Sequence, residues 1–217
     1  DEGMEENFLV NAWWAANIAR VASIFDIPYI SFSTNYVFDG RKEGDYKTTD
    51  IPHPINHYGM AKYLGEKMIQ REYSDAIIIR TSTLYGWDIS VRKHLIWVLY
   101  KKIITGELLS IVDDQTILPT LTTDLAVATK HILERKDDYL GSILHLTNSS
   151  DAWGISPYNI AWQLLDFMGV KRKIEPTSLE QYVSKAKRPK NSVLENTSDI
   201  VLPNWKESLR KYIDSIQ

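Results

Sequence analysis

The 217-residue chain contains no cysteine, and this absence excludes disulfides, thiolate metal ligands and cysteine nucleophiles together. It fits a reducing compartment, and we expect a cytoplasmic protein. No apolar run approaches the ~20 residues that a membrane-spanning helix needs. The net charge is −3, with 25 basic and 28 acidic residues, so no positive excess favours nucleic acid or an anionic membrane surface as a partner.

Two common kinds of catalytic site are also poorly represented. No serine lies in a G-x-S-x-G motif, which argues against a nucleophilic hydrolase. His53 and His57 are four residues apart, but Pro54 lies between them, and two solvent-exposed histidines is a better interpretation than a metal site. We therefore expect no bound metal.

The chain does contain an alternation of helical and strand patterns. The near-continuous apolar run at 76–80 is typical of a strand that is covered on both faces of a parallel sheet. Other strands are expected at 29–32 and 141–146, and helices at 8–24, 55–72, 95–104, 124–135, 156–168 and 205–216. Helix 8–24 is apolar on nearly every side, which predicts burial on more than one face, and Asp124 is placed to cap helix 124–135. This order predicts the α/β class with a parallel sheet.

Tyr58 and Lys62 form a candidate pair for proton chemistry. They are four residues apart in the expected helix 55–72, so their side chains share one face. A phenol has a pKa of about 10 and becomes useful near neutral pH only if a cation favours its phenolate. Lys62 is the candidate cation. Tyr63 and Lys67 have the same spacing but lie roughly 140° further round the helix, so the two pairs cannot face one site.

Hydroxyl side chains follow two of the expected strands. Ser33 and Thr34 form a turn after the first strand, and Thr81 and Ser82 follow the second. Ligands in open α/β sheets bind beyond the carboxyl ends of the strands. We therefore expect one site, in which Ser33 or Thr34 holds a substrate carbonyl while Tyr58 gives it a proton.

Several motifs together resemble a known family. Residues 33–40 read S-T-N-Y-V-F-D-G, and residues 54–66 read P-I-N-H-Y-G-M-A-K-Y-L-G-E. Both are similar to motifs of the extended short-chain dehydrogenase/reductase superfamily, and within it to the dTDP-4-dehydrorhamnose reductase family. The runs Arg80-Thr81-Ser82, Asp114-Gln115 with Pro119-Thr120, and Arg188-Pro189 fall in the order of that family.

The resemblance implies hydride transfer from NADPH or NADH to the C4 carbonyl of a nucleotide-linked 4-keto-6-deoxysugar, as in dTDP-L-rhamnose synthesis. It implies Tyr58 as proton donor, Thr34 as the residue that orients the carbonyl, and Lys62 as the residue that holds the nicotinamide ribose and lowers the pKa of Tyr58. The implied cofactor-binding residues are Asn11, Ser33, Tyr58, Lys62 and Thr81, and the implied substrate-binding residues are Thr34, Asn35, Tyr36, Ser82, Trp87 and Arg188. A homodimer through the helices at 8–24 and 55–72 is implied as well.

The chain departs from this family pattern in four places. None of its ten glycines has the G-x-x-G-x-x-G spacing of a dinucleotide-binding loop, so we expect a chain that lacks the N-terminal glycine-rich part and does not bind a dinucleotide tightly. Asn35 stands where the family usually has an aspartate, and Ile117 where it has a glycine. Thr83 stands where many members have a tryptophan, for which Trp87 could substitute. These three differences bear on the identity of the substrate more than on the type of reaction.

The expected domain organisation follows from the same resemblance. Residues 1–150 are expected to form the C-terminal portion of a Rossmann-type domain, with interspersed substrate-lobe segments around 84–120, and residues 151–217 mainly a substrate-binding lobe. Two alternatives stay open: a sugar-nucleotide epimerase or dehydratase on the same scaffold, and a non-catalytic, reductase-like regulatory or scaffold subunit.

Overall fold

The computed structural model describes residues 3–86, 94–182 and 186–216. The helical elements are α1 (Met4–Phe8), the π-helix η1 (Leu9–Trp14), α2 (Ala15–Ile24), the 3-10 helix η2 (Asn35–Val37), α3 (His57–Glu72), α4 (Leu95–Thr105), α5 (Thr122–Glu134), the 3-10 helix η3 (Lys136–Asp138), α6 (Pro157–Met168) and α7 (Trp205–Ile216). The strands are β1 (Ile30–Thr34), β2 (Ile77–Thr81), β3 (Leu84–Tyr85), β4 (Ser110–Val112), β5 (Thr120–Leu121), β6 (Ile143–His145), β7 (Asn148–Ser149), β8 (Glu175–Thr177) and β9 (Leu202–Asn204).

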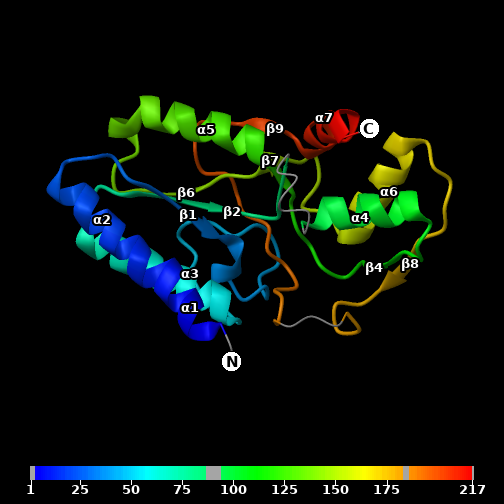
Figure 1. Cartoon of the computed structure of the whole chain (residues 1–217), viewed down its shortest axis with the longest axis horizontal. Helices are drawn as coiled ribbons and strands as arrows, with labels where there is room; N and C mark the ends of the chain where they lie inside the picture. Colours follow the sequence, from blue (N-terminus) through cyan, green and yellow to red (C-terminus); the bar gives the residue numbers. More distant parts are fainter. Residues whose placement is uncertain (1–2, 87–93, 183–185, 217) are drawn as a thin grey trace.

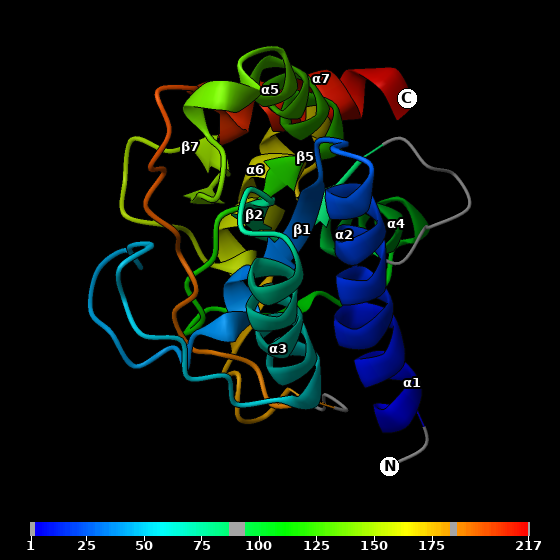
Figure 2. The ribbon, with the colours of Figure 1, turned by 90° about the vertical axis from the view of Figure 1, so that its left-hand side faces the viewer.

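The central sheet has the parallel order β1-β2-β6. Its middle strand, β2, is buried at every residue, because helices cover both faces of the sheet. Figure 1 shows α2 and α3 on one side of the sheet and α5 on the other, and Figure 2 shows α2 and α3 lying side by side. The predicted α/β class with a parallel sheet is therefore confirmed.

The ends of the main helices follow local chemistry. The side chain of Asn56 accepts a hydrogen bond from the amide of Gly59 at 2.8 Å and so begins α3, two residues after the expected start. Ser156 and Asn159 form a capping box at the start of α6, and Gly169 ends that helix with φ +64°. Helix α7 has the bounds expected from the sequence.

The first helical segment differs from its prediction. It begins at Met4 rather than Phe8, and a π-helical stretch, η1, interrupts it. Its small residues face α3, where a Cβ added to Gly65 would lie 2.2 Å from the carbonyl oxygen of Asn11. The opposite side is open, since Trp13 and Trp14 are 55% and 56% exposed. Within this chain, the expected burial on more than one face is wrong.

A separate apolar core lies beside the sheet. It combines α4, α6 and α7 with residues of β3, β4 and β5, which come from distant parts of the sequence. Strand β4 pairs in parallel with β8, and Figure 1 shows this pair and the three helices together at one end of the molecule. Among the described residues, no helix has both the length and the apolar character needed to cross a membrane.

Two local expectations are corrected by the structure. Ser33 and Thr34 are the last residues of β1, and the chain turns one residue later, in η2. Asp124 does not cap α5: its carboxylate accepts hydrogen bonds from the side chains of Asn148 (2.8 Å) and Ser208 (2.5 Å), and Leu121 takes the capping position. Asp124 therefore ties α5 to the C-terminal segment.

Candidate active site

A cavity of about 400 Å³ opens at the carboxyl ends of β1 and β2. At this end it is lined by Ser33, Thr34, Asn35, Tyr36, Tyr58, Thr81, Ser82 and Arg188. The hydroxyls come from two neighbouring parallel strands, and Tyr58 comes from the first turn of α3. The structure thus places Tyr58 in the same cavity as the strand-end hydroxyls.

Tyr58 and Thr34 lie together in the cavity lining. Burial of the phenol raises the pKa of Tyr58, and the side chain of Thr34 partly opposes this shift. The ring of Tyr36 lies edge-on to that of Tyr58, with 6.3 Å between centroids. The predicted lowering of the Tyr58 pKa by Lys62 is not found, because desolvation is the largest effect. In this state the phenol carries its proton at neutral pH.

Lys62 lies one helical turn after Tyr58 but contacts the strand rather than the cavity. Its ammonium donates a hydrogen bond to the carbonyl oxygen of Phe32 at 3.0 Å. Burial lowers the pKa of Lys62, while the carboxylate of Glu66 raises it. Lys62 is thus a partly buried cation fixed against β1.

Thr81 presents an unsatisfied hydroxyl at the cavity. Among the described residues, no hydrogen-bond partner accompanies its buried Oγ1. Buried hydroxyls normally have a hydrogen-bond partner, so a hydroxyl without one at the cavity wall is available to bind a ligand.

Asn35 links the strand ends to the C-terminal segment. Its amide donates hydrogen bonds to Oγ of Ser82 (2.9 Å) and to the carbonyl oxygen of Ser192 (3.1 Å). Arg188, four residues before Ser192, lies over the ring of Tyr182 at 5.3 Å, and its charge partly opposes the burial that raises the pKa of Tyr36. Asn35 therefore holds the segment that brings a guanidinium to the cavity.

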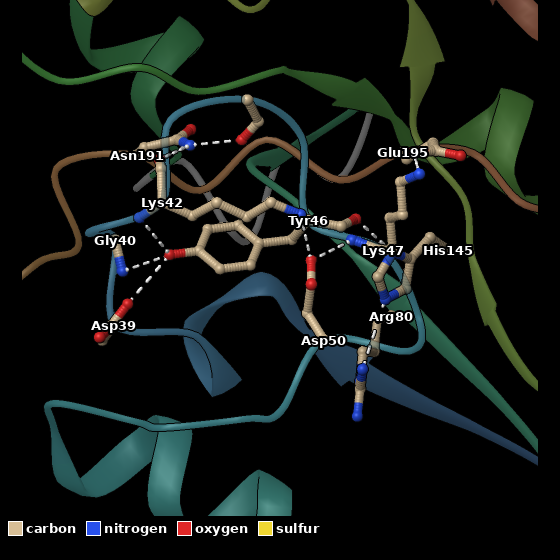
Figure 3. Close-up of polar contacts among 11 residues, drawn as sticks. Asp39, Gly40, Lys42, Tyr46, Lys47, Asp50, Arg80, His145, Asn191 and Glu195 are labelled. Carbon is tan, nitrogen blue, oxygen red and sulfur yellow. Dashed lines mark hydrogen bonds and ion pairs between the residues drawn. The ribbon is translucent and has the colours of Figure 1, made fainter.

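The loop between β1 and α3 supports this arrangement, as Figure 3 shows. The hydroxyl of Tyr46 accepts hydrogen bonds from the amides of Gly40 (2.9 Å) and Lys42 (3.2 Å) and donates one to Asp39 (3.0 Å). The amide of Asn191 donates to the carbonyl oxygens of Lys42 and Gly44, each at 2.8 Å. The loop and the segment that carries Arg188 are thus fixed to one another.

The other predicted residues lie apart from the cavity or outside the described chain. Asn11 is inside η1 rather than at a helix start, and its amide donates to the side chain (2.5 Å) and the carbonyl oxygen (3.0 Å) of Asn7. Trp87 lies outside the described residues. Tyr63 packs beside the cluster that contains Phe38, and the Lys67 ammonium lies 5.5 Å from its ring centroid, so this second pair faces a different region from Tyr58.

The far end of the cavity was not anticipated from the sequence. It is mainly apolar and is formed by Leu84, Leu95, Val98, Leu99, Lys102, Ile111, Val112, Ile117 and Pro157. These residues belong to or adjoin β3, α4, β4 and α6, and they look like ordinary core positions in the sequence. Gln115, which belongs to one of the family-like motifs, also lines the cavity and donates to the carbonyl oxygen of Pro189 at 3.0 Å.

A family model described as the RmlD substrate binding domain matches residues 1–217. The chain belongs to this family. Among RmlD-family relatives, a dTDP-4-dehydrorhamnose reductase from Sinorhizobium fredii is 31% identical over 96% of this chain and 73% of its own length. This family membership confirms the resemblance that the motifs indicated.

Solved structures with the same fold include two dTDP-4-dehydrorhamnose reductases. The dTDP-4-dehydrorhamnose reductase from Clostridium acetobutylicum is 31% identical, with a TM-score of 0.88 over 100% of this chain and 77% of its own. The enzyme from Bacillus anthracis, solved in complex with NADP, is 26% identical, with a TM-score of 0.88 over 99% of this chain and 76% of its own. The Rossmann-like arrangement of β1, β2 and β6 with their helices is shared with both.

Proposed function

We propose that the chain provides the carbonyl-reducing site of a dTDP-4-dehydrorhamnose reductase. The substrate is a dTDP-linked 4-keto-6-deoxysugar, and the reaction converts its C4 carbonyl to an alcohol with NADPH as the reductant. The observation that carries the proposal is that the Tyr58 phenol and the Thr34 hydroxyl line the same cavity at the carboxyl ends of β1 and β2. The relatives and solved neighbours named above support the sugar nucleotide and NADPH.

The residues present fit the nicotinamide end of such a cofactor. Thr81 offers a buried hydroxyl without a partner in the described part of the chain, and Ser33 lines the same cavity. Lys62 offers an ammonium beside β1, and Tyr58 completes the expected set. We propose that these residues hold the nicotinamide and its ribose, and that Asn11 supports them from η1. Bound NADPH supplies the hydride that the C4 carbon accepts.

The buried phenol of Tyr58 is the proposed source of the proton that the carbonyl oxygen receives. Because burial raises the pKa of Tyr58, the phenol remains protonated across the neutral range and can give its proton to the carbonyl oxygen. Thr34 donates a hydrogen bond to the same oxygen and so orients the carbonyl. The phenolate that remains takes a proton back from solvent. Carbon gains the hydride and oxygen gains the proton, which balances the reduction.

The rest of the cavity suits a nucleotide-linked sugar. We propose that Asn35, Tyr36 and Ser82 contact the sugar, and that Arg188 pairs with the diphosphate, for which a guanidinium is well matched. Trp87 remains a proposed sugar contact. We assign the apolar end of the cavity to the base, and the core of α4, α6 and α7 to a substrate-binding lobe built from segments around 84–120 and 151–217.

The test is a spectrophotometric assay of NADPH consumption with the dTDP-4-keto-6-deoxysugar, in a version of the protein that also carries a glycine-rich dinucleotide-binding segment, since this chain alone is expected to bind NADPH weakly. We expect sugar-dependent turnover, and a loss of roughly 10²–10⁴-fold in Tyr58→Phe with little change in NADPH affinity. Tyr63→Phe is the matched control on the same helix and should retain activity. Saturable NADPH binding without turnover would instead favour the regulatory subunit, and a mild effect of Tyr58→Phe would remove this residue from the acid role.

We also propose a homodimer through the helices at 8–24 and 55–72. Leu9, Trp13 and Leu64 border an apolar groove between the first helical segment and α3, and all three side chains are more than 40% exposed. Large exposed apolar patches typically mark protein contacts. A second copy of this face would bury the groove.

A further inference from the structure

In the described part of the chain, the ion pair between Glu66 and Arg80 differs from the others because both side chains are only 2% exposed. Arg80 donates to the carboxylate through Nη2 (2.7 Å) and Nε (2.9 Å), and the hydroxyl of Ser33 donates to Oε1 at 2.5 Å. A buried ion pair is weak evidence for stability, because lost hydration offsets the attraction. Its location therefore points to another role.

The pair belongs to a row of polar side chains that crosses the sheet. Ser33 on β1 is opposite Arg80 on β2, and Arg80 is opposite His145 on β6, so all three lie on the face that α3 covers. Nη1 of Arg80 lies 3.4 Å from Nε2 of His145, whose Nδ1 donates to the carbonyl oxygen of Tyr46 at 3.0 Å, as Figure 3 shows. Burial and the charge of Arg80 lower the pKa of His145 to about 3. At neutral pH the row therefore carries one positive and one negative charge.

Glu66 is also the third member of a series along α3. Tyr58, Lys62 and Glu66 are spaced four residues apart and share one face of the helix. Lys62 binds the carbonyl oxygen of Phe32, and Glu66 binds the hydroxyl of the next residue, Ser33. The two charged side chains thus hold consecutive residues of β1 immediately before Thr34. This contact fixes the end of the strand relative to the helix that carries the phenol.

We propose that Glu66 is a positioning residue for the reduction: it holds the Ser33–Thr34 strand end against α3, one helical turn from Lys62, which holds the preceding residue of the strand. Its action passes through Ser33 and Lys62, and Glu66 itself does not touch the reacting atoms. This positioning role rests on the proposed function, because it serves the reduction of the sugar carbonyl. The contacts and the charge effect on Lys62 can be tested without cofactor or sugar.

The experiment follows the titration of the Lys62 ammonium by NMR in the full chain labelled with ¹⁵N-lysine. A Lys62→Arg chain, which lacks the signal, assigns it. In Glu66→Gln, we expect the Lys62 midpoint to fall below that of the native chain, because an opposite charge is removed while the burial remains. Glu134→Gln is the matched control, since Glu134 lies four residues after Lys130 in an exposed pair, and it should leave Lys62 unchanged.

Two further variants separate positioning from general loosening of the fold. Arg80→Lys keeps the positive charge but loses the paired hydrogen bonds from Nε and Nη2 to the Glu66 carboxylate. It should therefore lower the free energy of unfolding and leave the Lys62 midpoint unchanged. If Glu66→Gln alone does not fold, the double variant Glu66→Gln/Arg80→Met removes the unpaired charge and should still lower the midpoint. An unchanged midpoint in a folded Glu66 variant, or an equal shift in Arg80→Lys, would overturn the proposal. Failure of the reduction assay would affect neither result.

Discussion

Replacing Gly65 by alanine tests the close contact between α3 and the first helical segment. An added Cβ lies 2.2 Å from the carbonyl oxygen of Asn11, 3.2 Å from its carbonyl carbon and 3.3 Å from Cα of Ala12. Carbon atoms in ordinary contact are about 3.5–4.0 Å apart. The helices must therefore separate by roughly 1 Å, since all three neighbouring atoms belong to the backbone and cannot rotate away.

Two opposing effects set the magnitude. Overfilling a packed contact costs about 1–3 kcal/mol, and the rigid backbone neighbours favour the upper end of this range. Alanine in a helix interior is favoured over glycine by about 1 kcal/mol. We expect Gly65→Ala to lower the free energy of unfolding by about 2 kcal/mol, the difference between these two effects.

Urea unfolding, followed by tryptophan fluorescence and by circular dichroism, measures this change. The matched control is Arg71→Ala, an exposed position near the end of the same helix, where we expect a change within about 0.5 kcal/mol. A Gly65→Ala chain that is as stable as the native one, or more stable, would refute the reasoning. In that case helix propensity alone would govern the position.

Two other predictions concern pH and assembly. In the unfolded chain His145 has its ordinary pKa of about 6.5, whereas in the folded chain burial and Arg80 lower this pKa to about 3. Between these two values only the unfolded chain takes up the proton. The free energy of unfolding should therefore fall by about 1.4 kcal/mol for each pH unit as the pH decreases through this window. His145→Gln should remove this contribution in urea titrations at pH 7 and pH 5, and an equal slope in both chains would contradict it. Trp13→Glu should convert the proposed dimer to monomer in light scattering, while Ile51→Glu, at a loop residue 86% exposed, should not; a native chain that is already monomeric would exclude the dimer.

Sequence patterns were sufficient for the elements that depend on local chemistry. The aliphatic run before Arg80 has the character of a doubly covered strand, and it forms β2. The bounds of α7 and the glycine end of α6 follow from amphipathic spacing and from the left-handed conformation that Gly169 adopts. The strand-end hydroxyls and Tyr58 were also brought to one cavity, because parallel strands end at the same edge of a sheet.

Features that depend on long-range contacts were not predictable in this way. The capping role expected for Asp124 was wrong because Asn148 and Ser208, distant in sequence, compete for its carboxylate. The pKa of Tyr58 was expected to fall, yet burial by neighbouring segments raises it. The apolar end of the cavity has no signature in the sequence, because residues such as Val98 come to line it only when separate elements meet.

The order β1-β2-β6 makes β1 an outer strand in the part of the chain that the structure describes. Backbone amides and carbonyls along an outer strand can accept a further strand. Here the strand ends at Ser33 and Thr34, so a strand added along β1 would lie beside the residues that line the proposed site. Anything that pairs with β1 would therefore also help to fix the position of these two hydroxyls.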